Sequence, residues 1–153
     1  MRIIVIGASH AGIAFADAMR RHGFAGPLTL IDRLDGMPLE RPPLSKAFLA
    51  GDPGDDDRFV LRKPDWFAAQ DIELITGCDV TSVDAEARKV RTADGQELAY
   101  DRLVMATGAV PRRLAGTEGL SGVFELRDPE DARRLRAAAR DAGSVVVLSL
   151  IHI

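Results

Sequence analysis

The sequence predicts an α/β fold, in which a parallel sheet carries an inserted antiparallel β-ribbon. Residues 1–33 follow the order strand, glycine turn, helix and strand, which is the layout of a βαβ unit. Residues 102–105 form a second apolar run that leads into a turn of small residues, as expected for another buried parallel strand. Asp94-Gly95 separates two short strand-like segments and is a strong signal for a hairpin turn.

The composition fits a soluble α/β domain and argues against several classes of function. The chain has 153 residues and a net charge of −3, so no basic face suggests nucleic acid. A single cysteine, Cys78, excludes a disulfide framework and a zinc cluster, and we expect no metal site. No apolar run approaches the roughly 20 residues that span a membrane, and no leader is recognised. We therefore expect a cytoplasmic protein that binds neither membrane nor nucleic acid.

The first turn has the features of a dinucleotide-binding turn. Ile3–Ile6 is a continuous apolar run, and Asp32 follows the next strand at about 20 residues beyond the turn. A glycine at the strand exit permits a sharp bend, and a glycine at the helix start permits close packing. The helix N–H groups then face a pyrophosphate. Ser9 replaces the usual middle glycine, and an ordinary turn without ligand remains an alternative. Within this turn, the Ser9 hydroxyl could contact phosphate, and His10 lies near any bound phosphate.

Further elements are expected in order along the chain. Trp66 and Phe67 are expected as core anchors. We expect Ser45 to cap a short helix and Asp128 to cap a long one. Helices are expected over 13–21, 45–50, 64–70 and 129–142, and strands over 28–31, 59–61, 72–75, 80–84, 89–92, 97–100, 102–105 and 144–148.

Two further segments carry candidate site residues. Arg41 and Lys46 flank a rigid turn with two prolines, which would aim two cations at one ligand. Two solvated surface charges are the alternative.

The strand over residues 102–105 is expected at the sheet centre, beside the first strand. Ligands of doubly wound sheets collect at the carboxyl ends of strands. Ala106-Thr107-Gly108 is therefore expected to face the same crevice as Gly7–Gly12.

Three motifs together resemble the N-terminal part of the FAD-dependent pyridine-nucleotide oxidoreductases, of the ferredoxin, rubredoxin and putidaredoxin reductase type. They are Gly7–Gly12, Glu40–Lys46 and Tyr100–Arg112. The first motif is common to many nucleotide-binding folds, whereas the second and third are specific in this order. The resemblance extends from Met1 to about Leu148 and implies a truncated Rossmann-like FAD-binding fold.

The resemblance implies a role for each matching position. Gly7, Ala11 and Gly12 would contact the FAD pyrophosphate, and Lys46 would lie near the flavin, with Arg41 along the cofactor. The backbone of Val80 would pair with adenine, Ala106, Thr107 and Gly108 would line the crevice, and Arg127 would lie near the flavin end. Asp32 would bind ribose, although many relatives carry this acid one place later, where this chain has Arg33.

The resemblance also implies electron relay from NAD(P)H through FAD to an iron–sulfur protein of the ferredoxin or rubredoxin type. Relatives with thiol chemistry have a cysteine beside the flavin, whereas Pro43, Leu44 and Ser45 occupy the corresponding region here. Cys78 lies in another segment. The flavin carries the chemistry, so we expect no catalytic side chain.

The expected domain organisation is that of a fragment. Residues 1–148 would form the N-terminal part of the FAD-binding domain and run into the first strand of an NAD(P)H domain. Residues 149–153 would be an aberrant tail, and the fragment would be inactive alone. Two alternatives remain, a non-catalytic nucleotide-binding module and a flavoprotein subunit that another chain completes.

Overall fold

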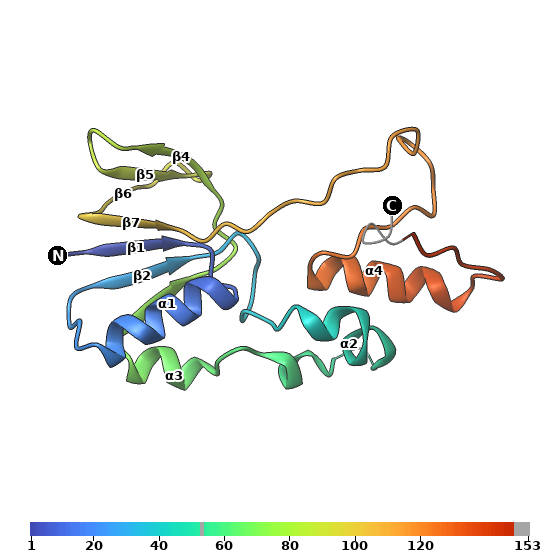
Figure 1. The fold of residues 1–153 in the computed structure, drawn as a ribbon, viewed down its shortest axis with the longest axis horizontal. Helices are drawn as coiled ribbons and strands as arrows, with labels where there is room; N and C mark the ends of the chain where they lie inside the picture. The colour runs from blue at the N-terminus through green and yellow to red at the C-terminus, as the bar shows by residue number, and fades with distance from the viewer. Residues whose placement is uncertain (53, 149–153) are drawn as a thin grey trace. The chain divides into compact units, whose positions relative to one another are not determined.

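The computed structural model describes residues 1–52 and 54–148, which belong to two compact units. Unit 1 consists of residues 1–40 and 58–109, and unit 2 of residues 41–57 and the chain from Val110 onward. Figure 1 shows the elements of each unit. The expected aberrant tail, residues 149–153, lies outside the described residues.

Unit 1 contains a four-stranded parallel sheet in the order β3-β2-β1-β7. Ile3 of β1 is level with Leu28 of β2 on one side and with Arg102 of β7 on the other. The predicted parallel sheet and the pairing of the first strand with residues 102–105 are confirmed. The expected central place of this strand is wrong, because β7 has one partner in the described sheet. The strands are β1 (Ile3–Ile6), β2 (Leu28–Ile31), β3 (Ile72–Ile75) and β7 (Arg102–Met105).

The sheet is apolar on both faces because each face is covered. Ile3 and Val5 pack in one cluster with residues of α1 (His10–Arg21) and α3 (Pro64–Ala69). Ile4 packs in a second cluster with the antiparallel ribbon. Unit 1 therefore has three layers, with helices, parallel sheet and ribbon in succession (Figure 1). This arrangement explains why the first strand is a continuous apolar run rather than an alternating one.

The ribbon is a three-stranded antiparallel sheet in the order β4-β5-β6. Val90 is fully buried against Ile4 and Ile31 of the parallel sheet. The turn predicted at Asp94-Gly95 is confirmed, since the Gly95 N–H donates to the Thr92 carbonyl at 3.0 Å. The strands are β4 (Val80–Asp84), β5 (Lys89–Thr92) and β6 (Glu97–Ala99).

Arg20 joins the end of α1 to two loops of unit 1. Its guanidinium donates to the carbonyls of Phe24 and Gly26, at 2.6 and 2.9 Å, before β2. It also donates to the carbonyls of Gln70 and Asp71, at 2.7 and 2.6 Å, between α3 and β3. One side chain thus satisfies four backbone acceptors and ties the C-terminal end of α1 to the loops that precede β2 and β3.

Unit 2 is built on two helices, α2 (Ala47–Ala50) and α4 (Pro129–Arg140). Phe48 is fully buried, and the guanidinium groups of Arg133 and Arg136 lie 6.0 and 5.2 Å from its ring centroid. The predicted cap of the long helix is confirmed. The Asp128 carboxylate accepts the Asp131 N–H at 3.0 Å, and the Asp131 carboxylate accepts the Asp128 N–H at 3.1 Å.

Three of the expected elements differ in the structure. The helix over residues 45–50 is divided, because Lys46 leaves the helical region with φ −130° and ψ −113°. It separates a 3-10 turn, η1 (Pro42–Ser45), from α2, and Ser45 is the last residue of η1 rather than a cap. The strand over 59–61 is replaced by a 3-10 turn, η2 (Asp56–Phe59), and a single bridge from Val60 to Leu39.

The third difference concerns residues 144–148, for which a buried strand was expected. These residues form no strand in the described structure, and Val146 is 94% exposed. A buried strand requires neighbours that accept its backbone hydrogen bonds and cover its side chains. In the described part of the chain no strand pairs with this segment, so the apolar pattern alone does not make it one.

Candidate functional site

The glycine turn lies where β1, β2 and β7 end together in unit 1. The Gly7 N–H donates to the Ile31 carbonyl at 2.7 Å, and the Ala106 N–H donates to the Ile6 carbonyl at 2.8 Å. Gly7 has φ +105°, and a Cβ at this position would overlap the carbonyl oxygen of Ala106. The structure therefore brings the glycine turn against Ala106, with Thr107 and Gly108 next in the chain, as predicted.

The first turn of α1 offers a set of backbone donors. Within the described chain, the N–H groups of residues 9–12 have no hydrogen-bond partner, and the Ser9 side chain makes no capping bond. His10 and Ala11 are exposed, whereas Gly12 is buried and a Cβ there would overlap the carbonyl oxygen of Gly7. Such unpaired N–H groups, with the helix dipole behind them, form an arrangement that binds phosphate.

Asp32 follows β2 at the same edge of the sheet and makes four hydrogen bonds. Its main chain bonds to Ile75 and Cys78, at 2.8 and 3.0 Å. Its carboxylate accepts the Ala8 N–H at 2.7 Å on one oxygen and the Leu34 N–H at 2.9 Å on the other. The predicted ribose ligand is thus at the expected edge, and its two oxygens already hold backbone N–H groups.

Val80 begins the ribbon close to this edge. Cys78, two residues earlier, donates its N–H to the carbonyl of Asp32, which ties the start of β4 to the end of β2. Val80 pairs with Thr92 and is partly buried against the cluster that contains Ile31. Val80 therefore lies in the same unit as the glycine turn, as its predicted role beside adenine requires.

The three predicted cations, Arg41, Lys46 and Arg127, belong to unit 2. Arg41 donates from Nη1 to the Arg127 carbonyl at 2.6 Å, so the structure brings these two residues together. The Arg127 N–H in turn donates to the Asp131 carboxylate at 3.0 Å. Lys46 is exposed between η1 and α2.

Asp131 lies in the first turn of α4 and belongs to this network, although it is not among the predicted site residues. Burial acts to raise the pKa of its carboxyl. Hydrogen bonds from the N–H groups of Asp128 and Arg127, together with Arg134, outweigh burial and hold the pKa below its usual range. Asp131 is therefore ionised at neutral pH and fixes the backbone of Arg127 at the start of α4.

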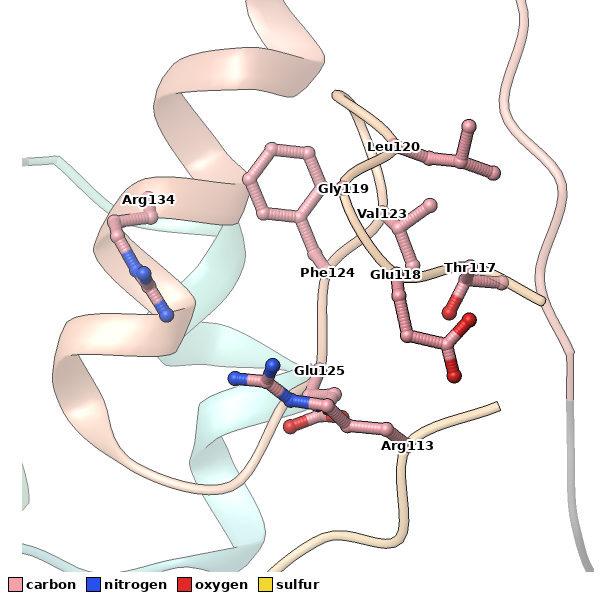
Figure 2. A pocket seen from close by; sticks show the side chains of 9 residues that line it. All are labelled: Arg113, Thr117, Glu118, Gly119, Leu120, Val123, Phe124, Glu125 and Arg134. Atoms are coloured by element: carbon pink, nitrogen blue, oxygen red, sulfur yellow. Dashed lines mark ion pairs between the residues drawn. The ribbon is translucent and has the colours of Figure 1, made fainter. Parts of the chain in front are cut away.

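Unit 2 also has a hollow of about 240 Å³. At one end, Arg113 Nε lies 4.0 Å from a carboxylate oxygen of Glu125, and Leu120, Val123 and Phe124 provide apolar surface (Figure 2). None of the predicted site residues lines it. The remaining lining residues are Thr117, Glu118, Gly119 and Arg134.

Burial, followed by the charges of Asp94 and Asp79, raises the pKa of the Cys78 thiol, which makes it a poor nucleophile. Residues 1–52 and 54–148 contain no group of three or more His, Cys, Asp or Glu side chains that could hold a metal ion. In the same residues, no helix combines the length and apolar character that a bilayer crossing needs.

Comparison with known proteins gives consistent matches over almost the whole chain. The sequence profile of the pyridine nucleotide-disulphide oxidoreductases matches residues 1–148. The chain is 39% identical over 150 residues to a rubredoxin–NAD(+) reductase of Pseudomonas putida. The aligned region covers 97% of this chain and 38% of that protein.

Solved structures give the same result. A ferredoxin reductase from Rhodopseudomonas palustris is 36% identical with a TM-score of 0.85, covering 92% of this chain and 34% of that one. A covalent putidaredoxin reductase–putidaredoxin complex matches at 36% identity and a TM-score of 0.79, over 90% of this chain and 34% of that one. These matches confirm the Rossmann-like α/β fold. The chain spans about a third of the length of these relatives.

Proposed function

The chain belongs to the pyridine nucleotide-disulphide oxidoreductase family, and from this membership we propose that it is the FAD-binding part of a flavin-dependent electron-transfer enzyme. The parent enzyme would take electrons from NAD(P)H and deliver them to an iron–sulfur protein of the ferredoxin or rubredoxin type. Residues 1–148 would correspond to the N-terminal part of its FAD-binding domain. The cytoplasmic location expected from the sequence stays a prediction.

The observation that carries the proposal is the set of unpartnered N–H groups at residues 9–12. They lie at the carboxyl edge of the parallel sheet, where the close approach of Gly7 to Ala106 leaves no room for side chains. Because the site offers N–H donors and a helix N-terminus, its chemistry fits a pyrophosphate. The residues present therefore fit the phosphate half of FAD.

The remaining predicted contacts extend this site. We propose that Gly7, Ser9, His10, Ala11 and Gly12 surround the pyrophosphate, that Asp32 and Val80 serve the adenosine end, and that Ala106, Thr107 and Gly108 line the crevice. Arg41, Lys46 and Arg127 would serve the flavin end. The chemistry that bound FAD would supply is acceptance of a hydride from NAD(P)H and release of single electrons. The task of this chain is to bind and orient FAD.

The choice of relay over thiol chemistry rests on the chain's own cysteine. Relatives with thiol chemistry carry a cysteine in the region that Pro43, Leu44 and Ser45 occupy here, whereas Cys78 lies in another segment. The pKa of Cys78 is raised, so its thiolate fraction at neutral pH is low. The names of the relatives, which are reductases for rubredoxin and putidaredoxin, support an iron–sulfur acceptor for the parent enzyme.

The first experiment is a titration of the purified chain with FAD, followed by flavin fluorescence and by gel filtration. The proposal expects one FAD per chain. Lys46→Gln should weaken binding, whereas Lys63→Gln, which removes an exposed lysine in unit 1, should leave it unchanged. Addition of NADH and NADPH to the same sample shows whether bound flavin is reduced without further sequence.

The outcomes separate the candidate functions. Bound FAD that NAD(P)H does not reduce supports an FAD-binding part of a larger enzyme. Binding of ADP with no preference for FAD would favour the non-catalytic nucleotide-binding module. Absence of FAD binding at about 100 µM, a concentration that would nearly saturate a site with a micromolar dissociation constant, would refute the proposal for this chain.

A further inference from the structure

Asp32 connects the ends of three strands through its own hydrogen bonds. Its main chain is bonded to Ile75 at the end of β3 and to Cys78. Its carboxylate holds the N–H of Ala8, which directly follows Gly7, and the N–H of Leu34 in its own loop. Ala8 is fully buried and Asp32 is partly buried, so water competes weakly for these bonds.

These bonds decide which N–H groups remain available to a ligand. The Gly7 N–H is bonded to Ile31 and the Ala8 N–H to Asp32, whereas those of residues 9–12 have no partner in the described chain. The boundary between bonded and available donors therefore falls between Ala8 and Ser9. A phosphate at this turn is directed toward the helix start rather than toward the strand exit.

We propose that Asp32 is a positioning residue of the phosphate-binding turn, which holds Ala8 in place so that the N–H groups of residues 9–12 converge on the pyrophosphate. This inference rests on the proposed function and deepens it. It differs from the role of a ribose ligand, because Asp32 acts here through the protein backbone. The lone pairs left on its oxygens still permit a contact with ribose.

The free protein gives the first test, by amide hydrogen exchange of Ala8 measured by NMR. In Asp32→Ala, exchange at Ala8 should accelerate by about tenfold or more, since a charge-assisted bond is lost. Val5, which lies in the β1 ladder, should keep its wild-type rate. Asp35→Asn is the matched control, because Asp35 is an exposed acid of the same loop that accepts the Gly36 N–H.

Asp32→Asn provides a second variant of nearly the same volume if Asp32→Ala does not fold. Its single carbonyl oxygen can keep one of the two N–H groups, so the exchange of Ala8, of Leu34 or of both should rise. Wild-type exchange rates at both amides, in either folded variant, would overturn the inference.

Cofactor binding gives the second test. FAD is compared with an analogue that lacks the 2′ and 3′ hydroxyls of the adenosine ribose. If Asp32 acts through the turn, Asp32→Ala, or Asp32→Asn where its Ala8 exchange is raised, weakens the binding of both compounds by the same factor, about tenfold. A loss confined to FAD would identify Asp32 as a ribose ligand and overturn the positioning role.

A urea melt of each variant separates positioning from general stability. A merely structural role would lower the midpoint and leave the FAD affinity of the folded protein at the wild-type value, which would also overturn the inference. Failure of the wild-type chain to bind FAD refutes the proposed function, whereas unchanged exchange at Ala8 and Leu34 refutes this inference. The two failures are therefore read from different measurements.

Discussion

Gly12→Ala tests how closely α1 approaches the glycine turn. Gly12 is a buried residue in the first turn of α1. A Cβ at this position would overlap the carbonyl oxygen of Gly7 and lie 3.4 Å from Cγ1 of Val5. The obstacle is backbone, so it cannot move aside as a flexible side chain does.

Two effects of opposite sign set the expected change in the free energy of unfolding of Gly12→Ala. Alanine is the better helix former by about 1 kcal/mol. Overpacking typically costs about 1 to 3 kcal/mol, and a backbone clash in a buried turn favours the upper end. The difference leaves a loss of about 2 kcal/mol in the free energy of unfolding. With a urea slope of about 2 kcal/mol per molar, the midpoint should fall by about 1 M.

The assay is urea unfolding followed by circular dichroism, with FAD titration on the folded protein. Gly143→Ala is the matched control, because a Cβ there meets nothing within 4 Å. Its midpoint should stay close to that of the wild type. We expect Gly12→Ala to weaken FAD binding as well, since the clash displaces the turn. If Gly12→Ala were as stable as the wild type, or more stable, α1 would not pack on the turn as described, and the donor arrangement proposed for the pyrophosphate would lose its basis.

Two further predictions concern side chains outside the turn. Arg20→Lys keeps the charge but not the guanidinium that reaches four carbonyls, so the free energy of unfolding should fall by about 2 kcal/mol. Arg21→Lys, which alters an exposed arginine, is the control. Equal thermal melting temperatures of the two variants would contradict this prediction. Asp131→Asn should destabilise α4 by about 1 kcal/mol at pH 7. Because the pKa of Asp131 is lowered in the folded protein, the stability it adds is present at neutral pH and is lost as the pH falls below about 4. Amide exchange in α4 of the wild type and the variant should therefore differ at pH 7 and converge at low pH, and a difference that persists there would show another cause.

The parallel sheet and the ribbon could be predicted because their residues carry local signals. Ile3–Ile6 is apolar on both faces, and Asp94-Gly95 suits a hairpin turn whatever surrounds it. The errors arise where the outcome depends on neighbours. Residues 144–148 have the pattern of a buried strand but no partner in the described chain, and the expected helix over residues 45–50 is interrupted at Lys46.

The candidate site shows the same distinction. The glycines and the adjacent Ala106 turn could be located from motifs, since parallel strands end at a common edge. The bond from the Ala8 N–H to Asp32 depends on the distance between the ends of β1 and β2, which no local pattern encodes. The bond from Arg41 to the Arg127 carbonyl joins segments 86 residues apart and carries no signal of its own.

The pairing of β1 with β7 has a consequence for synthesis of the protein. Ile3 is level with Arg102, so β1 acquires its second neighbour only after about 100 further residues have been translated. At about 5 to 20 residues per second, this edge of β1 stays open for roughly 5 to 20 seconds on the ribosome. During this interval, β1 exposes an unpaired row of backbone groups beside apolar side chains. The nascent chain is then vulnerable to aggregation, and a chaperone that covers apolar strands would act at this stage.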